Sequence, residues 1–424
     1  MERYKTFLEH YTSTMTAYEQ LYKHLHANPE LSLQESKTSA LVGDRLHQYG
    51  YKVTRNIGGH GVVGVLSNGL GKTVLIRADM DALPVFEQTG LSYASSCTAI
   101  DLAGAQQPVM HACGHDMHVT CALAAAEILA NTIEAWSGTA VVLFQPDEEG
   151  GRGADAMIAD GLFEAQRHAC PRPDVLLAQH IFPSRAGMVG TKRGAMASSV
   201  DSFTVTLKGR GGHAAQPHLT IDPVLLASHI VIRLQGIISR EIKPGDFAVI
   251  TVGSIEAGTV SNIIPEKATM KVTIRAQSRD NRDKLITGFK RVVRAECLAS
   301  NSPEPVFEPG RPSPELLNDE GMTQKLEQTF AEIFGKEHYS DHASPLFGAE
   351  DFGKLAIPID APYCYWTIGC IDPDVWNAAE KDGRLDSIPA NHSPFFAPAI
   401  QPTLRTGTIA LAAAALTFLD SSSL

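Results

Sequence analysis

A nine-residue run at positions 110–118, MHACGHDMH, gathers a thiol, a carboxylate and three imidazoles in one short segment. These are the side chains that bind borderline divalent metals such as zinc. Gly114 allows the backbone to turn sharply, so Cys113 and His115 can face one point. His115 and His118 are three residues apart and share a face if a helix has begun there. Although a single histidine usually has an ordinary core or surface role, a thiol and three imidazoles in one short loop predict a metal site.

A second acidic segment, FQPDEEG at positions 144–150, follows a continuous apolar run that is typical of a buried strand. Its carboxylates then lie at the carboxyl end of the strand, where active sites of α/β proteins are found. Adjacent glutamates on an irregular turn can point in different directions, so one can bind metal while the other carries a proton. Glu148 and Glu149 are the candidates for base and ligand, and a solvated acidic loop is the alternative.

Further polar groups follow other apolar runs. RADMDALP at positions 77–84 ends one of them, and its Asp79 and Asp81 share a face suited to ligating metal or to orienting a histidine. His180 ends a third apolar run, and His392 lies in a loop near the C-terminus. The convergence of these groups on one sheet edge predicts the site more strongly than any single residue does.

Alternating amphipathic helices and buried apolar strands would position these groups. This alternation predicts an α/β domain with a largely parallel sheet. The predicted helices cover residues 11–26, 36–49, 116–130 and 403–419, and the predicted strands cover residues 62–66, 73–77, 138–144 and 175–180.

The pattern changes near residue 198, where strands begin to alternate apolar and polar residues. The order strand–helix–strand–strand–helix–strand predicts a small α+β domain inserted in the larger one. The insert contains KGRGGHAA at positions 208–215, whose three glycines could present His213 at a moving interface. The predicted boundaries are 1–197 for the first part of the catalytic domain, 198–312 for the inserted lid and 313–424 for the second part.

Composition excludes several other functions. A formal net charge of -11, without a cluster of Lys and Arg, argues against nucleic acid as a partner. The longest apolar segment, at residues 409–419, is too short to span a membrane and predicts a buried helix. Seven scattered cysteines and a polar first segment predict a reducing, cytoplasmic location. The final Ser-Ser-Leu, at residues 422–424, only half resembles a peroxisomal signal.

The segment GLGKT at positions 69–73 is a near match to a phosphate-binding loop. Such a loop must open a helix, whereas this one leads into the predicted strand at 73–77. Leu66 also occupies the position of the required first glycine. The segment is interpreted as a hairpin turn, which disfavours an ATPase. A zinc deaminase is disfavoured as well, because the sequence has no P-C-x-x-C motif.

Taken in order, the motifs resemble the dinuclear metallohydrolase family of aminoacylases and carboxypeptidases. Within it they are most similar to the branch of hippurate hydrolases and auxin–amino-acid conjugate hydrolases. The resemblance implies a three-layer α/β/α metallopeptidase-like catalytic domain with an inserted ferredoxin-like lid, which many relatives use to form homodimers. It covers nearly the whole chain and includes LHANPEL at 25–31, VSNIIP at 260–265, FGAEDF at 347–352 and HSP at 392–394.

The resemblance also implies roles for single residues. Glu148 would be the general acid/base for a metal-activated water, and Asp81 would support the metal ligands. Asp79 stands where other branches carry a ligating histidine. Two divalent ions, most readily zinc or manganese and otherwise cobalt or nickel, would be held by Cys113, His115, Glu149, His180 and His392. The lid would turn three residues toward the substrate, namely His213, Asn262 and Arg275, the last suited to a free carboxylate.

The predicted activity is hydrolysis of the amide bond of an N-acyl amino acid or a similar conjugate. A carboxypeptidase or dipeptidase is the alternative within the same chemistry, and a metal-binding protein without catalysis is a distant one. The second glutamate of the pair, Glu148, speaks against the latter, because structural zinc sites are usually closed by four Cys or His ligands. One departure from the branch is the stretch of about 30 residues between Glu149 and His180, interpreted as a local loop insertion.

Overall fold

The computed structural model describes residues 2–164 and 166–419, and these form two compact units. The first unit comprises the described chain up to Gly194, together with Leu317–Ser344 and the described chain from Asp351 onward. The second unit comprises Ala195–Leu316 and Pro345–Glu350. The C-terminal Ser-Ser-Leu that raised the question of targeting lies outside the described residues.

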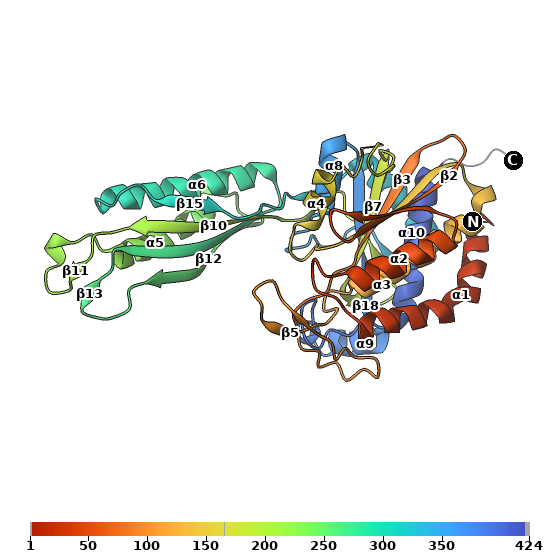
Figure 1. Ribbon diagram of the computed structural model, residues 1–424, viewed down its shortest axis with the longest axis horizontal. Helices are drawn as coiled ribbons and strands as arrows, with labels where there is room; N and C mark the ends of the chain where they lie inside the picture. Colours follow the sequence, from red (N-terminus) through yellow and green to blue (C-terminus); the bar gives the residue numbers. More distant parts are fainter. Residues whose placement is uncertain (1, 165, 420–424) are drawn as a thin grey trace. The chain divides into compact units, whose positions relative to one another are not determined.

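The first unit is built on an eight-stranded sheet in the order β1-β2-β6-β3-β7-β18-β8-β17 (Figure 1). Its four central strands are mutually parallel: β6 (Gly138–Gln145), β3 (Thr73–Asp79), β7 (Val175–Arg185) and β18 (Tyr363–Ile371). Antiparallel pairs join β1 (Lys52–Ile57) to β2 and β2 (Gly61–Asn68) to β6 on one side, and β18 to β8 (Val189–Gly190) on the other. The short β17 (Tyr339–Ser340) pairs parallel with β8. The predicted α/β class is confirmed, with parallel strands confined to the centre of a mixed sheet.

Helices cover both faces of this sheet, which explains why its central strands are apolar without interruption. One face is covered by α1 (Glu2–Ala27), α2 (Ser36–Gln48), α3 (His115–Asn131), α7 (Glu320–His338) and α10 (Ile400–Phe418), whose buried side chains share one core with the strands. On the other face, Met157 of α4 (Gly153–Ala159) lies against Gly61, and Phe352 of α8 (Phe352–Ala356) packs against Tyr365. The helix α9 (Pro373–Lys381) follows β18.

The interpretation of residues 69–73 as a hairpin turn is wrong. The segment joins β2 to β3, but these strands are not neighbours because β6 lies between them. A turn sequence cannot reveal that a strand some 65 residues later pairs in the middle. The segment does lead into a strand rather than a helix, so the argument against a phosphate-binding loop holds.

The second unit has a four-stranded antiparallel sheet in the order β12-β14-β10-β15 with two helices packed on it. The alternation along β10 buries one side of the strand, as expected: Phe203, Val205 and Leu207 pack in the core with the helices. Helix α5 is capped by Asp222, the residue before its first, whose side chain accepts hydrogen bonds from two backbone N–H groups of the first turn. The elements, in chain order, are β10 (Ser199–Lys208), α5 (Pro223–Glu241), β12 (Ala248–Ala257), β14 (Lys267–Ala276), α6 (Arg279–Ala299) and β15 (Val306–Pro309).

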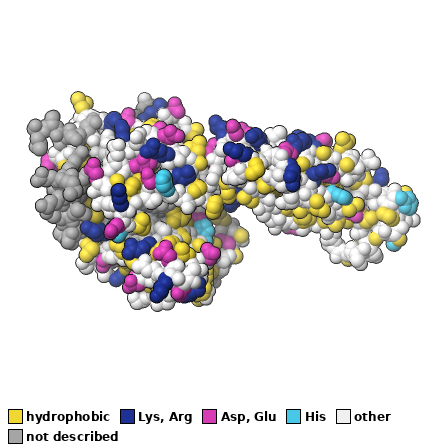
Figure 2. All heavy atoms as spheres, turned by 180° about the vertical axis from the view of Figure 1, so that it is seen from behind, with side chains coloured by type: hydrophobic (Ala, Val, Ile, Leu, Met, Phe, Trp, Pro, Cys, Tyr) yellow, Lys and Arg dark blue, Asp and Glu magenta, His cyan; other side chains and the backbone are white. Residues whose placement is uncertain are grey.

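The surface charge and the helices bear on the two functions that the sequence argues against, nucleic-acid binding and membrane insertion. Figure 2 shows acidic and basic side chains interspersed over the visible face of the first unit, consistent with a chain of formal net charge -11. Among the described residues, no helix is long and apolar enough to cross a membrane. The apolar segment at residues 409–419 lies largely in α10, where nearly all of its side chains are buried.

Candidate metal centre and active site

Side chains from several segments of the first unit meet near the carboxyl ends of its parallel strands. Asp79 is the last residue of β3, as expected, whereas His180 lies inside β7, which continues to Arg185. The end of an apolar run is thus not the end of the strand, because β7 continues with residues that are only partly buried. The other groups are Asp81 after β3, Cys113 and His115 at the start of α3, Glu148 and Glu149 after β6, and His392 in the loop before α10.

Gly114 makes the sharp turn between Cys113 and His115 possible. It is the N-cap residue of α3 and has a left-handed backbone with φ of +86°. A Cβ atom at this position would lie 2.3 Å from Cδ1 of Ile181. Both the conformation and the close contact therefore require glycine. The turn brings the Cys113 thiol and the His115 imidazole into one group with Glu149, in which the three candidate ligand atoms lie within 4.8 Å of one another.

His115 is oriented by Asp81. Its Nδ1 lies 3.2 Å from Asp81 Oδ1, which also accepts the backbone N–H of Glu148. A carboxylate on one ring nitrogen fixes the tautomer and leaves the other nitrogen as a metal ligand. His115 Nε2 is buried and has no hydrogen-bond partner among the described residues. An unpartnered buried nitrogen of this kind fits a bound cation.

His180 is oriented in the same way by the backbone. Its Nδ1 donates to the carbonyl oxygen of Ile181 at 2.7 Å, so Nε2 carries the free lone pair. That Nε2 lies 3.4 Å from Cys113 Sγ. Asn391 holds the same region together, because its Nδ2 donates to the carbonyl oxygens of Cys113 and Ile181, each at 3.2 Å. Sequence reasoning missed Asn391, although it precedes His392 directly.

Glu149 and His392 complete the group of predicted ligands. Glu149 Oε1 lies 3.3 Å from His392 Nε2 and 3.9 Å from His115 Nε2. This oxygen is buried and receives no well-aligned hydrogen bond from the part of the chain that is described. The His392 backbone, with φ of +71°, is anchored by its N–H to the carbonyl oxygen of Ala112 at 2.8 Å. The structure therefore brings all five predicted ligands into one connected set.

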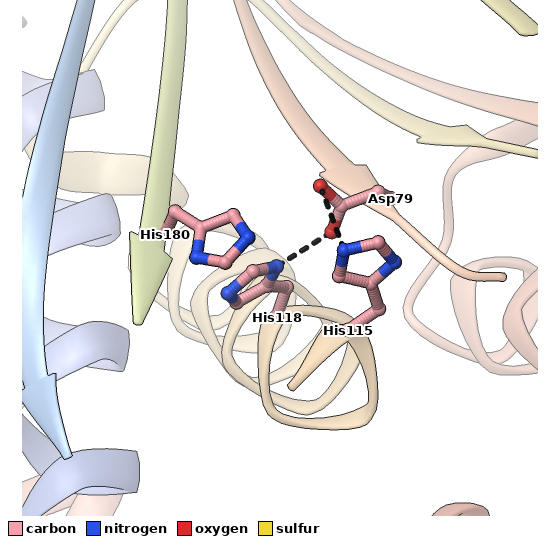
Figure 3. A group of neighbouring side chains, drawn as sticks. All are labelled: Asp79, His115, His118 and His180. Carbon is pink, nitrogen blue, oxygen red and sulfur yellow. Dashed lines mark hydrogen bonds and ion pairs between the residues drawn. The ribbon is translucent and has the colours of Figure 1, made fainter. Parts of the chain in front are cut away.

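Asp79 and His118 lie beside two of these ligands, His115 and His180, in a compact group (Figure 3). His118 Nδ1 is 2.5 Å from Asp79 Oδ1, and its Nε2 accepts the backbone N–H of Ile181 at 2.9 Å. The His118 ring stacks on His115 at 5.4 Å and meets His180 edge-on at 4.3 Å. Because both nitrogens of His118 are occupied by these hydrogen bonds, the geometry favours a supporting role for this histidine over metal binding.

Asp79 is likewise committed to its neighbours. Its Oδ2 pairs with Nη1 of the buried Arg77 at 2.6 Å, while its Oδ1 binds His118. Arg77 also donates to Gln145 at 3.0 Å and to Asp351 at 3.2 Å. A buried charge needs such partners to offset its lost hydration. Of the two roles predicted for Asp79, orienting a histidine is the one that this geometry favours, and sequence reasoning did not foresee the part of Arg77.

Electrostatics support a cation at this site. Burial raises the pKa of the Cys113 thiol well above its usual range, and Glu149 and Glu148 add to that shift. Burial lowers the pKa of His180 well below its usual value, with His118 contributing. A divalent ion needs a thiolate and a neutral imidazole and would itself stabilise the thiolate. The donor set of sulfur, nitrogen and oxygen therefore fits borderline divalent ions.

Glu148 lies beside Glu149 and is about equally exposed. Its side chain is 11% exposed against 12% for Glu149, and its Oε2 lies 4.0 Å from His115 Nε2. The backbone N–H groups of Glu148 and Glu149 donate to the two oxygens of Asp81 at 3.2 and 3.1 Å. The turn thus fixes the two glutamates side by side at the edge of the ligand group. Because Glu149 also lies 3.3 Å from His392 Nε2, Glu148 is the better candidate of the two for proton transfer.

His213 and Asn262, two of the predicted substrate residues, lie together in the second unit. The two-stranded ribbon of β11 (Gly212–His213) and β13 (Ile263–Ile264) joins them, and the Ala214 N–H donates to the Asn262 carbonyl oxygen at 3.1 Å. Both residues are exposed. The ribbon lies beyond the end of the four-stranded sheet (Figure 1). The structure therefore joins these two residues, and their contact with substrate stays a prediction.

Arg275 lies at the other end of this sheet. On β14, Lys267 pairs with Lys208 at the end next to the ribbon, whereas Arg275 pairs with Val200 at the opposite end. Eight residues of strand separate these pairs by roughly 25 Å. Arg275 Nη1 donates to the carbonyl oxygen of Phe347 at 2.9 Å. Within one copy of the second unit, Arg275 is thus not brought together with His213.

Comparison with known proteins agrees with this geometry. The profile of peptidase family M20/M25/M40 matches residues 75–390. The chain is 38% identical to a hippurate hydrolase of Campylobacter jejuni over 79% of this chain and 84% of that one. It is 33% identical to thermostable carboxypeptidase 2 of Saccharolobus solfataricus, over 94% of each chain. The crystal structure of YXEP of Bacillus subtilis, described as a dinuclear metal-binding peptidase of family M20, superposes with a TM-score of 0.77 at 25% identity, covering 96% of this chain and 98% of that one.

The family match and the ligand group lead to one assignment. The matched segment covers most of the chain and contains nearly all the residues discussed above. The resemblance inferred from the motifs, including its branch, is therefore confirmed. The chain belongs to peptidase family M20/M25/M40 and is a metal-dependent hydrolase of amide bonds.

Proposed function

We propose that the protein hydrolyses the amide bond of N-acyl amino acids or similar amino-acid conjugates, with Glu148 as general acid/base. The observation that carries this proposal is the position of two adjacent glutamates at the ligand group. Glu149 Oε1 lies 3.3 Å from His392 Nε2 and 3.9 Å from His115 Nε2, and Glu148 Oε2 lies 4.0 Å from the same His115 nitrogen. The similarity to a hippurate hydrolase supports an acyl amino acid as the substrate class.

We propose that two divalent ions are held by the five predicted ligands, Cys113, His115, Glu149, His180 and His392. When bound, such ions activate a water and polarise the amide carbonyl. Glu148 accepts the proton of the attacking water and returns it to the departing amine. Asp81 keeps His115 and the glutamate turn in register during this transfer. Zinc and manganese are the expected ions, with cobalt or nickel as substitutes, because the ligands mix sulfur, nitrogen and oxygen.

The second unit is proposed to act as the lid, spanning residues 198–312, with His213 facing the oxyanion, Asn262 contacting the substrate and Arg275 binding the substrate carboxylate. Since Arg275 and His213 lie at opposite ends of one sheet, a small substrate cannot reach both from a single copy. A homodimer formed through the lid would let a second copy supply one of the two. This geometry supports a homodimer, which sedimentation of the purified protein tests directly.

A cytoplasmic location is proposed as well. All seven cysteines are free thiols. Six of them are buried, including the candidate ligand Cys113, and Cys97 is partly exposed. Free thiols are typical of a reducing compartment. Fractionation of the native cells, with the protein detected by antibody, tests this proposal.

The alternative activity is that of a carboxypeptidase or dipeptidase, which the similarity to a carboxypeptidase keeps open. A hydrolysis screen separates the two. Enzyme reconstituted with each metal is assayed on N-acetyl and N-benzoyl amino acids and, in parallel, on dipeptides. Higher kcat/KM for the acyl amino acids supports the proposal, whereas higher kcat/KM for dipeptides would replace it with the alternative.

A further inference from the structure

The segment at residues 32–35 follows the LHANPEL run and has no part in the proposed catalysis so far. Its Glu35 is 0% exposed although it carries a carboxyl group. Its Oε2 finds no hydrogen-bond partner in the described part of the chain. Burying a carboxyl group is unfavourable unless hydrogen bonds compensate. The hydrogen bonds that Glu35 accepts through its other oxygen, Oε1, must therefore compensate for its burial.

Glu35 Oε1 binds two backbone N–H groups. It accepts from Leu33 at 2.9 Å and from Asp147 at 2.8 Å. Both donors have left-handed backbones, with φ of +67° and +51°. Residues other than glycine keep that conformation only where surrounding contacts hold it. Glu35 thus fixes the backbone of Asp147, the residue directly before Glu148.

The same turn is held by a second carboxyl group. Three successive backbone N–H groups, those of residues 147, 148 and 149, donate to carboxyl oxygens, the first to Glu35 and the next two to Asp81. Ser32 Oγ donates to Asp81 Oδ2 at 2.6 Å. Successive N–H groups of this kind form a concave backbone site for negative charge. Residues 32–35 therefore hold the turn directly through Glu35 and indirectly through Asp81.

We propose that Glu35 is a positioning residue for Glu148, because its hydrogen bond to Asp147 sets the direction in which the turn leaves β6. The proposal rests on the acid/base role of Glu148. Burial, with Asp81 nearby, raises the pKa of Glu35 to about 8. A carboxamide at position 35 would resemble this largely protonated carboxyl group and would keep the acceptor oxygen for both N–H groups.

The test compares Glu35→Ala with Glu35→Gln. Glu35→Ala removes the acceptor and should lower kcat by roughly 10²-fold, the cost of misplacing a catalytic group by about 1 Å. KM and metal content should stay near their wild-type values, and Glu35→Gln should keep most of kcat. Loss of activity in both variants, or in neither, would overturn the proposal.

A neighbouring carboxylate provides the matched control. Glu30 accepts backbone N–H groups of Lys37 and Thr38 at 3.1 and 2.8 Å, and so it caps α2 instead of holding the glutamate turn. Glu30→Ala should lower the thermal unfolding midpoint and leave kcat unchanged. If Glu30→Ala lowered kcat as much as Glu35→Ala does, the effect of Glu35→Ala would be a general structural one, which contradicts the proposal. Should Glu35→Ala not fold, Glu35→Asp replaces it, since the shorter side chain withdraws the oxygen from Asp147.

A double-mutant cycle separates this proposal from the proposed function. In a Glu148→Gln background, Glu35→Ala should lower kcat no further, because no base is left to position. If the decrease in kcat of the double variant were the product of the two single decreases, the positioning role would be contradicted. If Glu148→Gln alone retained kcat, the acid/base assignment would fail by itself, independently of any result at Glu35.

Discussion

The two units hold their predicted functional residues in opposite ways. In the first unit, His115 and His180 are buried, and each has one ring nitrogen fixed by a partner. In the second unit, His213 and Asn262 lie exposed on a short ribbon. The candidate ligand group is thus built from side chains that the first unit fixes in place, whereas two of the residues expected to contact substrate lie exposed in the second unit.

This difference predicts which measurable quantity each substitution changes. Substituting a metal ligand of the first unit, or a residue that orients one, should change metal binding, because the core preorganises the site. Substituting a residue of the second unit should change the kinetic constants and leave metal binding intact. The following substitutions test this division, beginning with the largest expected effect.

Replacing Glu148 should have the largest effect on turnover. Glu148→Gln should lower kcat by at least roughly 10²–10⁴-fold, because an amide cannot transfer the proton. Bound metal, measured by elemental analysis, should be retained. Glu149→Gln is the matched control and should lose metal, since Glu149 Oε1 lies within 4 Å of Nε2 of both His115 and His392. Near-native kcat in Glu148→Gln would remove this residue from the mechanism.

His213 tests the second unit. His213→Ala should lower kcat and kcat/KM together by about 10²–10³-fold, the size expected for one lost oxyanion donor. Arg275→Ala should raise KM instead, because a carboxylate contact exists in ground and transition states alike. Steady-state kinetics with parallel metal analysis separates the two patterns. An increase in KM alone for His213→Ala, or no change in either constant, would mean that the histidine is structural.

The Asp79–His118 pair tests the support beneath the ligands. His118→Phe removes the acceptor of the Ile181 N–H and the partner of Asp79. Metal affinity should fall by roughly 10–100-fold, as is typical when a group that orients a ligand is lost. Asp79→Asn should act in the same direction, because Arg77 then loses one of its charged partners and keeps Asp351. Titration of the metal-free variants measures the effect, and wild-type affinity in both would refute a supporting role.

The smallest predicted effect concerns stability and pH. Buried His26 lies 2.6 Å from Asp116 and 3.1 Å from Glu87. Burial lowers its pKa, but these carboxylates outweigh that and raise it to about 10. Because the folded pKa exceeds the unfolded value of about 6.5, the contribution to stability is fully present below that pH and is lost as the pH rises toward 10.

The thermal unfolding midpoint of the wild-type protein should therefore fall more steeply between about pH 6.5 and pH 10 than that of His26→Gln. The difference between the two curves isolates His26, because every other titrating group is present in both proteins. Parallel curves for the two proteins would show that His26 gains no proton on folding.

The sequence allowed the ligand set to be proposed, but not the contacts that orient it. Cys113 and His115 share one motif, so their proximity follows from spacing alone. The acceptor role of His118 depends on where the Ile181 N–H points, and residue spacing does not encode that direction. Glu35 binds Asp147 across 112 positions of sequence. The mixed sheet was missed for the same reason, because the pairing of β2 with β6 is set by tertiary packing.

The central claim is that the first unit binds divalent ions through these five side chains and needs them for hydrolysis. The most direct measurement is elemental analysis of purified enzyme before and after chelation, with amide hydrolysis assayed on the same samples. The account predicts up to two ions per chain, loss of activity when they are removed and recovery when zinc or manganese is restored. Full activity in enzyme shown to contain no metal would contradict it.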